Sequence, residues 1–312
     1  MKWKVAVAAL ALVCLCARAN AADDASCRNV RFADVGWSDI VASTALASVV
    51  LEAIGYTPSV TVASIPVALT GLKNKQIDVL TGYWHPAMDA LMQPYVAAGQ
   101  IKVMDQPNLE GARYSLAVPQ YLFDRGLKTF ADIARFQKEL QGKIHGIEPG
   151  NEGNALIRSM IRDNRFGLQN FQLIESSETA MLVEARSAAR SRKPIVFLAW
   201  EPHPMNVQIK MRYLSGGDDV FGPNLGEAKV YTAIATPYPA RCPNAATFLK
   251  NLQVSSDMES QVMAAILEGA RPAVAARNVL KTRLAAVDPW LRGVTTFDGR
   301  DALPEAMSAL KR

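Results

Sequence analysis

Three of the five tryptophans in the chain share a local context that could bind a ligand. Each ends an apolar, strand-like run and is followed at once by polar or turn-forming residues: Trp37 in VRFADVGWSD, Trp84 in QIDVLTGYWHP and Trp200 in PIVFLAWEPHP. Open α/β sheets place their ligands at the carboxyl ends of strands, so indoles collected there would wall a pocket. Stacked ring faces with few hydrogen-bond donors suit a quaternary ammonium ion. A single tryptophan in this context is more often a packing residue, but the threefold repetition favours a pocket.

Three further residues near these positions could contact the same ligand. Asp39 follows Trp37 by two residues, at a turn from strand to helix, where a carboxylate favours the helix N-terminus and would also attract a cation. Asn151 lies in a Gly-Asn-Glu-Gly turn before a predicted helix, which it can cap, and it could also reach a ligand hydroxyl. Tyr114 lies on a predicted strand, where a tyrosine either packs half-buried or adds a fourth ring to a cage.

The sequence offers little material for catalysis or metal binding. His85, His145 and His203 have no metal-ligand spacing, and His85 and His203 stand beside prolines, as rim or loop residues would. The chain contains no Gly-x-Ser-x-Gly elbow and no His-Glu-x-x-His helix. We therefore predict a binding protein without catalytic activity, metal or cofactor.

The N-terminal segment has the pattern of a secretory signal peptide, to which we assign residues 1–22. Lys2 and Lys4 precede an apolar run, and small residues around Ala21 follow it. The run is shorter than the roughly 20 residues that span a bilayer, and no later stretch qualifies, so we expect a soluble, exported protein. The formal charge of +5 falls to +2 when the three basic residues of this segment are removed, which excludes a basic nucleic-acid surface.

Two cysteines, Cys27 and Cys242, remain after the signal peptide. An exported protein with two cysteines usually oxidises them, so we predict one disulfide between them. This bond would place both ends of the mature chain in the same lobe.

Strand and helix patterns alternate along the first part of the mature chain. Apolar runs and turn residues predict strands at residues 30–35, 59–63 and 77–81 and helices at residues 38–54, 66–73 and 87–98. Such alternation is typical of a doubly wound α/β lobe with a parallel sheet.

A second set of units follows. The same signals predict strands at residues 112–118, 143–147, 171–175 and 195–199 and helices at residues 130–139, 154–164 and 179–191. A strand at residues 230–236 and mainly helical chain to about residue 290 come last. Because the disulfide would join the two ends, we expect residues 23–111 and 217–312 to form lobe I and residues 112–216 to form lobe II. Two segments would then cross between the lobes, as in hinge-closing solute receptors.

Several motifs resemble those of a known protein family. The segments VGWSDI, TGYWHP, ARYSLAVP and LAWEPHP and the Gly-Asn-Glu-Gly turn are similar to the periplasmic choline and glycine-betaine-binding proteins that feed ABC importers, and most of all to the choline-specific receptors. The likeness covers nearly all of the mature chain. It implies an α/β, two-lobe periplasmic binding protein fold of type II, with two crossings and a central sheet flanked by helices in each lobe.

The resemblance also implies roles for individual residues. The trimethylammonium group would be held in an aromatic box of four rings, here Trp37, Trp84, Tyr114 and Trp200. Asp39 and Asn151 match the acidic residue and the asparagine that hold the hydroxyl of choline. Receptors of this kind carry a disulfide that agrees with Cys27 and Cys242. The implied partner is an ABC importer permease, and we expect a periplasmic monomer.

The physical chemistry of the site favours choline over glycine betaine. Betaine would bring a carboxylate close to Asp39, and two negative charges in a dry cleft repel each other. Choline brings a hydroxyl instead, and acetylcholine lacks that donor and needs more room. Receptors for betaine, carnitine or another trimethylammonium solute remain alternatives, as do an exported choline-ester hydrolase that uses Ser38 near a histidine and a sensor ectodomain.

Overall fold

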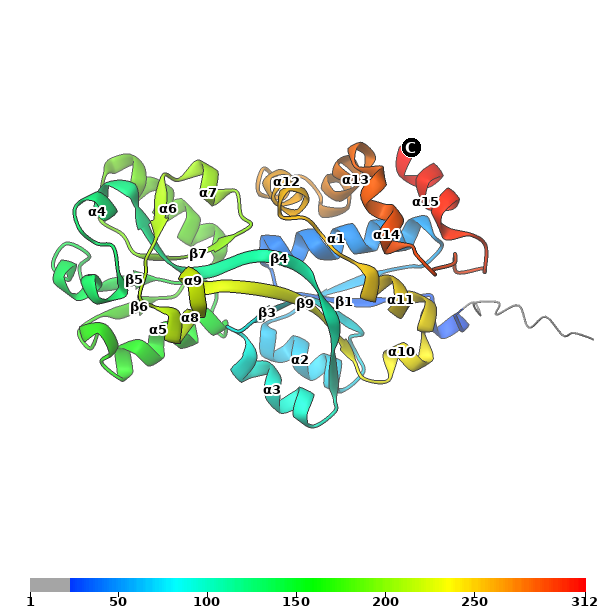
Figure 1. The fold of residues 1–312 in the computed structure, drawn as a ribbon, viewed down its shortest axis with the longest axis horizontal. Coiled ribbons are helices and arrows are strands. Elements are labelled where there is room, and N and C mark those ends of the chain that lie inside the picture. Colours follow the sequence, from blue (N-terminus) through cyan, green and yellow to red (C-terminus); the bar gives the residue numbers. More distant parts are fainter. Residues whose placement is uncertain (1–22) are drawn as a thin grey trace, which may run out of the picture.

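The computed structural model describes residues 23–312; the signal peptide assigned to residues 1–22 lies outside them. The described chain is elongated, with two α/β lobes side by side along its length (Figure 1). Two long strands, β4 (Ile101–Pro119) and β9 (Glu227–Ala235), run between the lobes. The α/β, two-lobe architecture expected from the sequence is confirmed.

A single curled sheet passes through both lobes. Within residues 23–312 it has nine strands in the order β2-β1-β3-β9-β4-β7-β5-β6, with β8 beside β4. The pairs β2–β1–β3 and β6–β5–β7 are parallel, whereas β9 and β4 run antiparallel to their neighbours. The shorter strands are β1 (Arg31–Asp34), β2 (Ser59–Val62), β3 (Val79–His85), β5 (Lys143–His145), β6 (Gln172–Ile174), β7 (Phe197–Glu201) and β8 (Met211–Tyr213).

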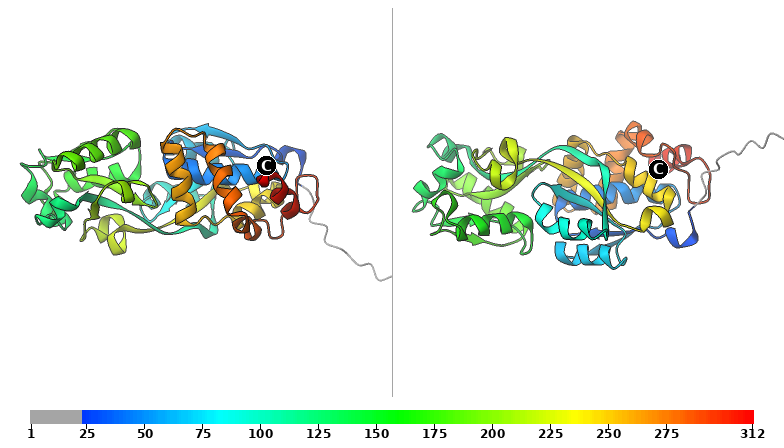
Figure 2. Two further views of the ribbon diagram at one scale, coloured as in Figure 1. Left: turned by 90° about the horizontal axis from the view of Figure 1, so that it is seen from above. Right: turned by 60° about the horizontal axis from the view of Figure 1, so that its bottom comes forward.

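Helices cover both faces of the sheet in the first lobe. Helix α1 is buried on nearly all sides because the sheet lies below it and α12, α13 and α15 pack above it, which explains why its sequence is apolar all round. The views in Figure 2 place α12 and α13 on this face and α2 and α3 on the opposite one. The helices of this lobe are α1 (Ser38–Ala53), α2 (Ile65–Lys73), α3 (Asp89–Ala97), α10 (Tyr238–Arg241), α11 (Pro243–Asn251), α12 (Ser256–Leu267), α13 (Pro272–Thr282), α14 (Val287–Trp290) and α15 (Ala302–Lys311).

The second lobe contains β5 to β8 and shorter helices. Its longest helices, α5 and α6, each begin at a side-chain cap: Asn151 accepts a hydrogen bond from the backbone of Asn154, and Ser177 accepts one from Ala180. The helices of this lobe are α4 (Gln120–Asp124), α5 (Glu152–Arg162), α6 (Glu178–Ser191), α7 (Met205–Gln208), α8 (Asp218–Phe221) and α9 (Pro223–Gly226). Within residues 23–312, no helix of either lobe has the length and apolar character needed to cross a bilayer.

Several predicted elements differ from those observed. The strand expected at residues 112–118 is only the last part of β4, which begins at Ile101. Pro107 and Gly111 normally interrupt strands, but shifts in the pairing register with β9 near these two residues allow the strand to continue through them. The helix expected at residues 130–139 is a 3₁₀ helix, Phe130–Phe136, and both β8 and α15 were not predicted. At Arg113 the backbone of β4 pairs with both β9 and β7, next to residue 112, where we expect the second lobe to begin. The exact limits of the two lobes stay a prediction.

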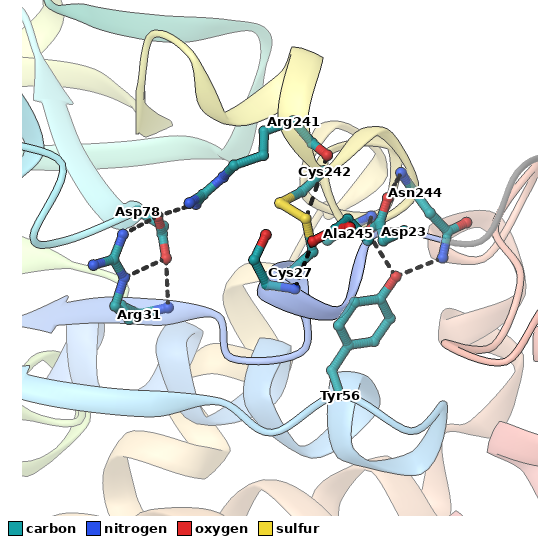
Figure 3. Close-up of a disulfide and its surroundings, with 11 residues drawn as sticks. Asp23, Cys27, Arg31, Tyr56, Asp78, Arg241, Cys242, Asn244 and Ala245 are labelled. Carbon is teal, nitrogen blue, oxygen red and sulfur yellow. Dashed lines mark hydrogen bonds and ion pairs between the residues drawn. A yellow bond between two sulfur atoms is a disulfide. The ribbon is translucent and has the colours of Figure 1, made fainter.

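The predicted disulfide is confirmed. Cys27 and Cys242 are bonded, with their Cα atoms 5.6 Å apart, between the segment before β1 and the start of α11 (Figure 3). Nearby, Asp23 accepts hydrogen bonds from the phenol of Tyr56 and from the backbone of Asn244, so several interactions fix this end of the first lobe.

Candidate functional site

Aromatic side chains from both lobes line a small cavity where the lobes meet. Its wall contains the four rings that the sequence predicted, and its empty volume is about 230 Å³. This figure includes space open to solvent, so the enclosed part is smaller still, and the cavity suits only a ligand of few atoms. The lining residues are Trp37, Asp39, Trp84, Tyr114, Ile147, Glu152 and Trp200.

The rings come from four separate elements. Trp37 is the residue before α1, Trp84 lies on β3, Tyr114 on β4 and Trp200 on β7. Tyr114 and Trp200 are cross-strand partners. The ring centre of Tyr114 is 5.9 Å from that of Trp84 and 6.3 Å from that of Trp200, with interplanar angles of 51° and 69°. Inclined rings of this kind can turn their electron-rich faces toward a common space, which is what a cation without hydrogen-bond donors requires.

Two glycines leave the space that Tyr114 occupies in the wall of the cavity. A Cβ atom at Gly153, in the first turn of α5, would lie 2.0 Å from the phenol oxygen of Tyr114, and one at Gly226 would lie 2.0 Å from its carbonyl oxygen. Gly226 also has a φ of +81°, which other residues rarely adopt. The second glycine of the Gly-Asn-Glu-Gly turn therefore has a steric function at the site.

Asp39 lies in the wall of the cavity, in the first turn of α1. Its carboxylate accepts a hydrogen bond of 2.9 Å from the indole nitrogen of Trp84, and only 3% of its surface is exposed. Burial raises the pKa of Asp39 to about 7, and the negative charge of Glu178 acts in the same direction. A cation in the cavity would offset both effects and favour the ionised carboxylate.

Asn151 lies beside the cavity and is not among the residues of its wall. Its side-chain oxygen accepts a hydrogen bond of 2.8 Å from the backbone of Asn154 and lies 3.5 Å from the phenol oxygen of Tyr114, which can donate to it. Its amide nitrogen donates to the backbone carbonyl of Glu148. The capping function considered from the sequence is thus observed, and contact with a ligand hydroxyl stays a prediction.

Glu152 is a cavity residue that sequence reasoning missed. It is the first residue of α5, and its Oε2 atom is buried and accepts no hydrogen bond from residues 23–312. Burial raises the pKa of Glu152 to about 7, with a further contribution from the charge of Asp39. Its position in the Gly-Asn-Glu-Gly turn was the available signal, but a glutamate at a helix N-terminus already has an ordinary explanation.

Hydrogen bonds join the two lobes next to the cavity. The indole nitrogen of Trp37 donates to Glu148 at 3.0 Å. The backbone nitrogen and the hydroxyl of Ser38 donate to the two carboxylate oxygens of Glu178, at 2.9 and 2.6 Å. The start of α1 is therefore bound to the second lobe beside the aromatic cavity.

His203 also bonds to Glu178, which bears on the hydrolase alternative. The Nδ1 atom of His203 accepts a hydrogen bond from the backbone of Met205 at 2.9 Å, so Nε2 carries the proton and donates to Glu178 at 3.2 Å. Ser38 and His203 thus both bond to the carboxylate of Glu178. The imidazole has no lone pair available for the Ser38 proton, and this arrangement is not that of a nucleophile and its base.

The fold and the site define a class of protein: a two-lobe solute-binding protein with an aromatic cavity between its lobes. Residues 28–282 match the family OpuAC, described as the substrate binding domain of ABC-type glycine betaine transport systems, and the chain belongs to this family.

Two solved structures and one curated protein extend this comparison. An ABC-transporter choline binding protein in complex with choline is 49% identical, with a TM-score of 0.89 over 91% of this chain and 99% of that one. A structure described as an ABC-transporter choline binding protein in an unliganded semi-closed conformation is 49% identical, with a TM-score of 0.83 over 92% and 100%. The glycine betaine/carnitine transport binding protein GbuC of Listeria monocytogenes is 26% identical over 162 residues, which are 52% of this chain and 53% of that protein.

Proposed function

We propose that this chain is the receptor of an ABC importer and that it captures choline by closing its two lobes over the trimethylammonium group. The observation that carries the proposal is the cavity wall, which combines four aromatic rings with two buried carboxylates and, among the described residues that line it, includes no basic side chain. Such a wall attracts a cation and provides nothing that would neutralise a ligand carboxylate.

The energetics agree with a small quaternary ammonium ligand. Each cation–π contact contributes roughly 0.5 to 2 kcal/mol, so four rings contribute several kcal/mol together. Asp39 adds charge attraction in a buried setting, where it is screened less than at the surface. Choline also brings no second negative charge toward Asp39, whereas glycine betaine does.

Closure of the two lobes is expected because each lobe supplies some of the residues that would contact the ligand. We assign residues 23–111 and 217–312 to one lobe and residues 112–216 to the other, with β4 and β9 as the connecting strands. Trp37 and Asp39 then belong to one lobe and Trp200 to the other, so a ligand that contacts all of them favours the closed state. The bonds from Ser38 to Glu178 would form on closure and support it.

Location and partners follow from the proposed role. We place the receptor in the periplasm as a monomer that delivers its ligand to an ABC permease, without catalytic activity of its own. Incubation of the purified protein with acetylcholine tests the last point, because steady release of product would revive the hydrolase alternative.

Calorimetric titration with choline, glycine betaine and acetylcholine tests the ligand assignment. We expect choline to bind at least tenfold more tightly than either of the others. Equal binding of glycine betaine would overturn the assignment of choline.

Substitution of a ring tests the cage. Trp200→Ala should weaken choline binding at least tenfold, because it removes one face of the box and opens it to water. Thermal unfolding of the variant checks that it is folded, and an unchanged dissociation constant for choline would exclude Trp200 from the cage.

A further inference from the structure

We infer that Glu152 is a specificity-determining residue, which makes the cavity prefer a ligand that ends in a hydroxyl over one that ends in a carboxylate. This inference rests on the proposed function, because it assigns a role within the same cavity. Neither the aromatic box nor Asp39 requires it.

The first observation is the state of the Glu152 side chain. The residue lines the cavity, 3% of its surface is exposed, and its Oε2 atom receives no hydrogen bond from any residue between 23 and 312. Buried carboxylate oxygens are nearly always paired, since an unpaired one loses the hydration it would have in water. An acceptor left unused in the wall of a ligand cavity points to a donor on the ligand.

The second observation is an unused donor in the same wall. The indole nitrogen of Trp200 is buried and, within the described chain, has no acceptor. A hydroxyl group can donate one hydrogen bond and accept others, so it can pair with both Glu152 and Trp200. A carboxylate can only accept, and wherever Glu152 is ionised it would place a second negative charge beside that residue.

The neighbouring Asn151 is less available for this role. Its oxygen already faces two donors, the backbone of Asn154 and the phenol of Tyr114, and its nitrogen donates to the carbonyl of Glu148. The turn therefore uses most of the hydrogen-bonding capacity of Asn151, whereas no residue between 23 and 312 donates a hydrogen bond to the Oε2 atom of Glu152.

The test compares choline and glycine betaine as ligands of the wild type and of Glu152→Gln by calorimetry. Glutamine keeps the size of the side chain and removes its charge, and its amide can donate to a carboxylate. We expect the ratio of the two dissociation constants to shift toward betaine by at least tenfold. A ratio within twofold of the wild type would overturn the inference.

Glu259→Gln is the matched control. Glu259 on α12 is also 3% exposed and also has a buried Oε2 atom without a partner among residues 23–312, but it does not line the cavity. The ratio should stay within twofold of the wild type in this variant. An equal shift in both variants would show a general effect of replacing a buried glutamate by glutamine and would also overturn the inference.

Two further readings separate the possible failures. If the wild type does not bind choline, both the proposed function and the inference fail. If the wild type binds choline but the ratio of the choline and betaine dissociation constants is unchanged in Glu152→Gln, only the inference fails. Should Glu152→Gln not fold, Glu152→Asp replaces it, because it retracts the carboxylate by one methylene. The ratio should then shift by at least threefold, and an unchanged ratio would count against Glu152.

Discussion

At the scale of single residues, the site combines aromatic rings that attract a cation with buried carboxyl groups whose ionised form is unfavourable unless a cation is bound. Asp39 and Glu152 both line the cavity, and burial raises the pKa of each to about 7. The ligand-free cavity therefore holds protons near neutral pH, although a quaternary ammonium ion is best bound by ionised carboxylates. Ligand binding and proton release should be coupled.

This coupling predicts a pH dependence of choline affinity. Below pH 7 the carboxylates of the free protein are protonated and must lose protons to bind the cation, so affinity falls as the pH falls; above pH 8 they are already ionised and affinity is constant. One such group with a pKa of about 7 weakens binding about tenfold between pH 8 and pH 6. Calorimetry at several pH values measures this, and titration in two buffers of different ionisation enthalpy counts the protons. Constant affinity from pH 6 to pH 8 would contradict the coupling.

The sequence predicted most cavity residues because their signal was local. Trp84 and Trp200 end strands, and Trp37 and Asp39 follow one, so the general rule for ligand positions in α/β sheets applied to them. Glu152 had no such signal, because its burial depends on Tyr114, which is distant along the chain, and on Asp39, which we assign to the other lobe. Contacts between lobes are not encoded in any short segment.

At the scale of elements, the start of α1 is the point where one lobe binds the other. Ser38 donates two hydrogen bonds to Glu178 at the start of α6, and Glu178 in turn donates its backbone N–H to Glu148 at 2.8 Å. In the proposed lobe assignment the two bonds from Ser38 cross between the lobes, whereas the bond from Glu178 to Glu148 lies within the second lobe. The bonds from Ser38 would therefore contribute to the closed state and be lost on opening.

Ser38→Ala should therefore weaken choline binding while leaving the stability of the open protein unchanged. A hydrogen bond to a charged group contributes about 1.5 kcal/mol or more, which corresponds to about tenfold in affinity. Ser48→Ala is a control on the same helix, because the buried hydroxyl of Ser48 has no partner within the described residues. Calorimetry measures the dissociation constants, and urea unfolding without ligand measures stability. Equal affinities in the two variants would mean that the Ser38 bond does not act in closure.

The length of β4 shows why some elements could not be predicted. Its first part contains Pro107 and Gly111, which normally interrupt strands, and the sequence predicted a strand only from residue 112. Pairing with β9 keeps this part extended, with register shifts at the positions of the two residues. The partner strand lies more than a hundred residues away along the chain, so local propensity gave the wrong boundary.

At the scale of the whole molecule, binding and stability depend on opposite ends of the first lobe. The cavity lies where the two lobes meet, whereas the disulfide lies near α10 and α11 at the far end (Figure 1). Around the disulfide, Arg31 and Arg241 both bond to Asp78, so contacts other than the covalent bond also hold this end (Figure 3).

Removing the disulfide should lower stability and leave ligand affinity unchanged. The bond joins residues 215 positions apart, and closing so long a loop restricts the unfolded chain by about 5 kcal/mol in the entropy model. We expect Cys27→Ala combined with Cys242→Ala to reduce the free energy of unfolding in urea by about 2 to 5 kcal/mol. The dissociation constant for choline should stay within twofold of the wild type, because the disulfide lies at the end of the lobe away from the cavity. A tenfold loss of affinity in a folded double variant would mean that the disulfide sets the position of α1, and the separation of stability from binding argued here would be wrong.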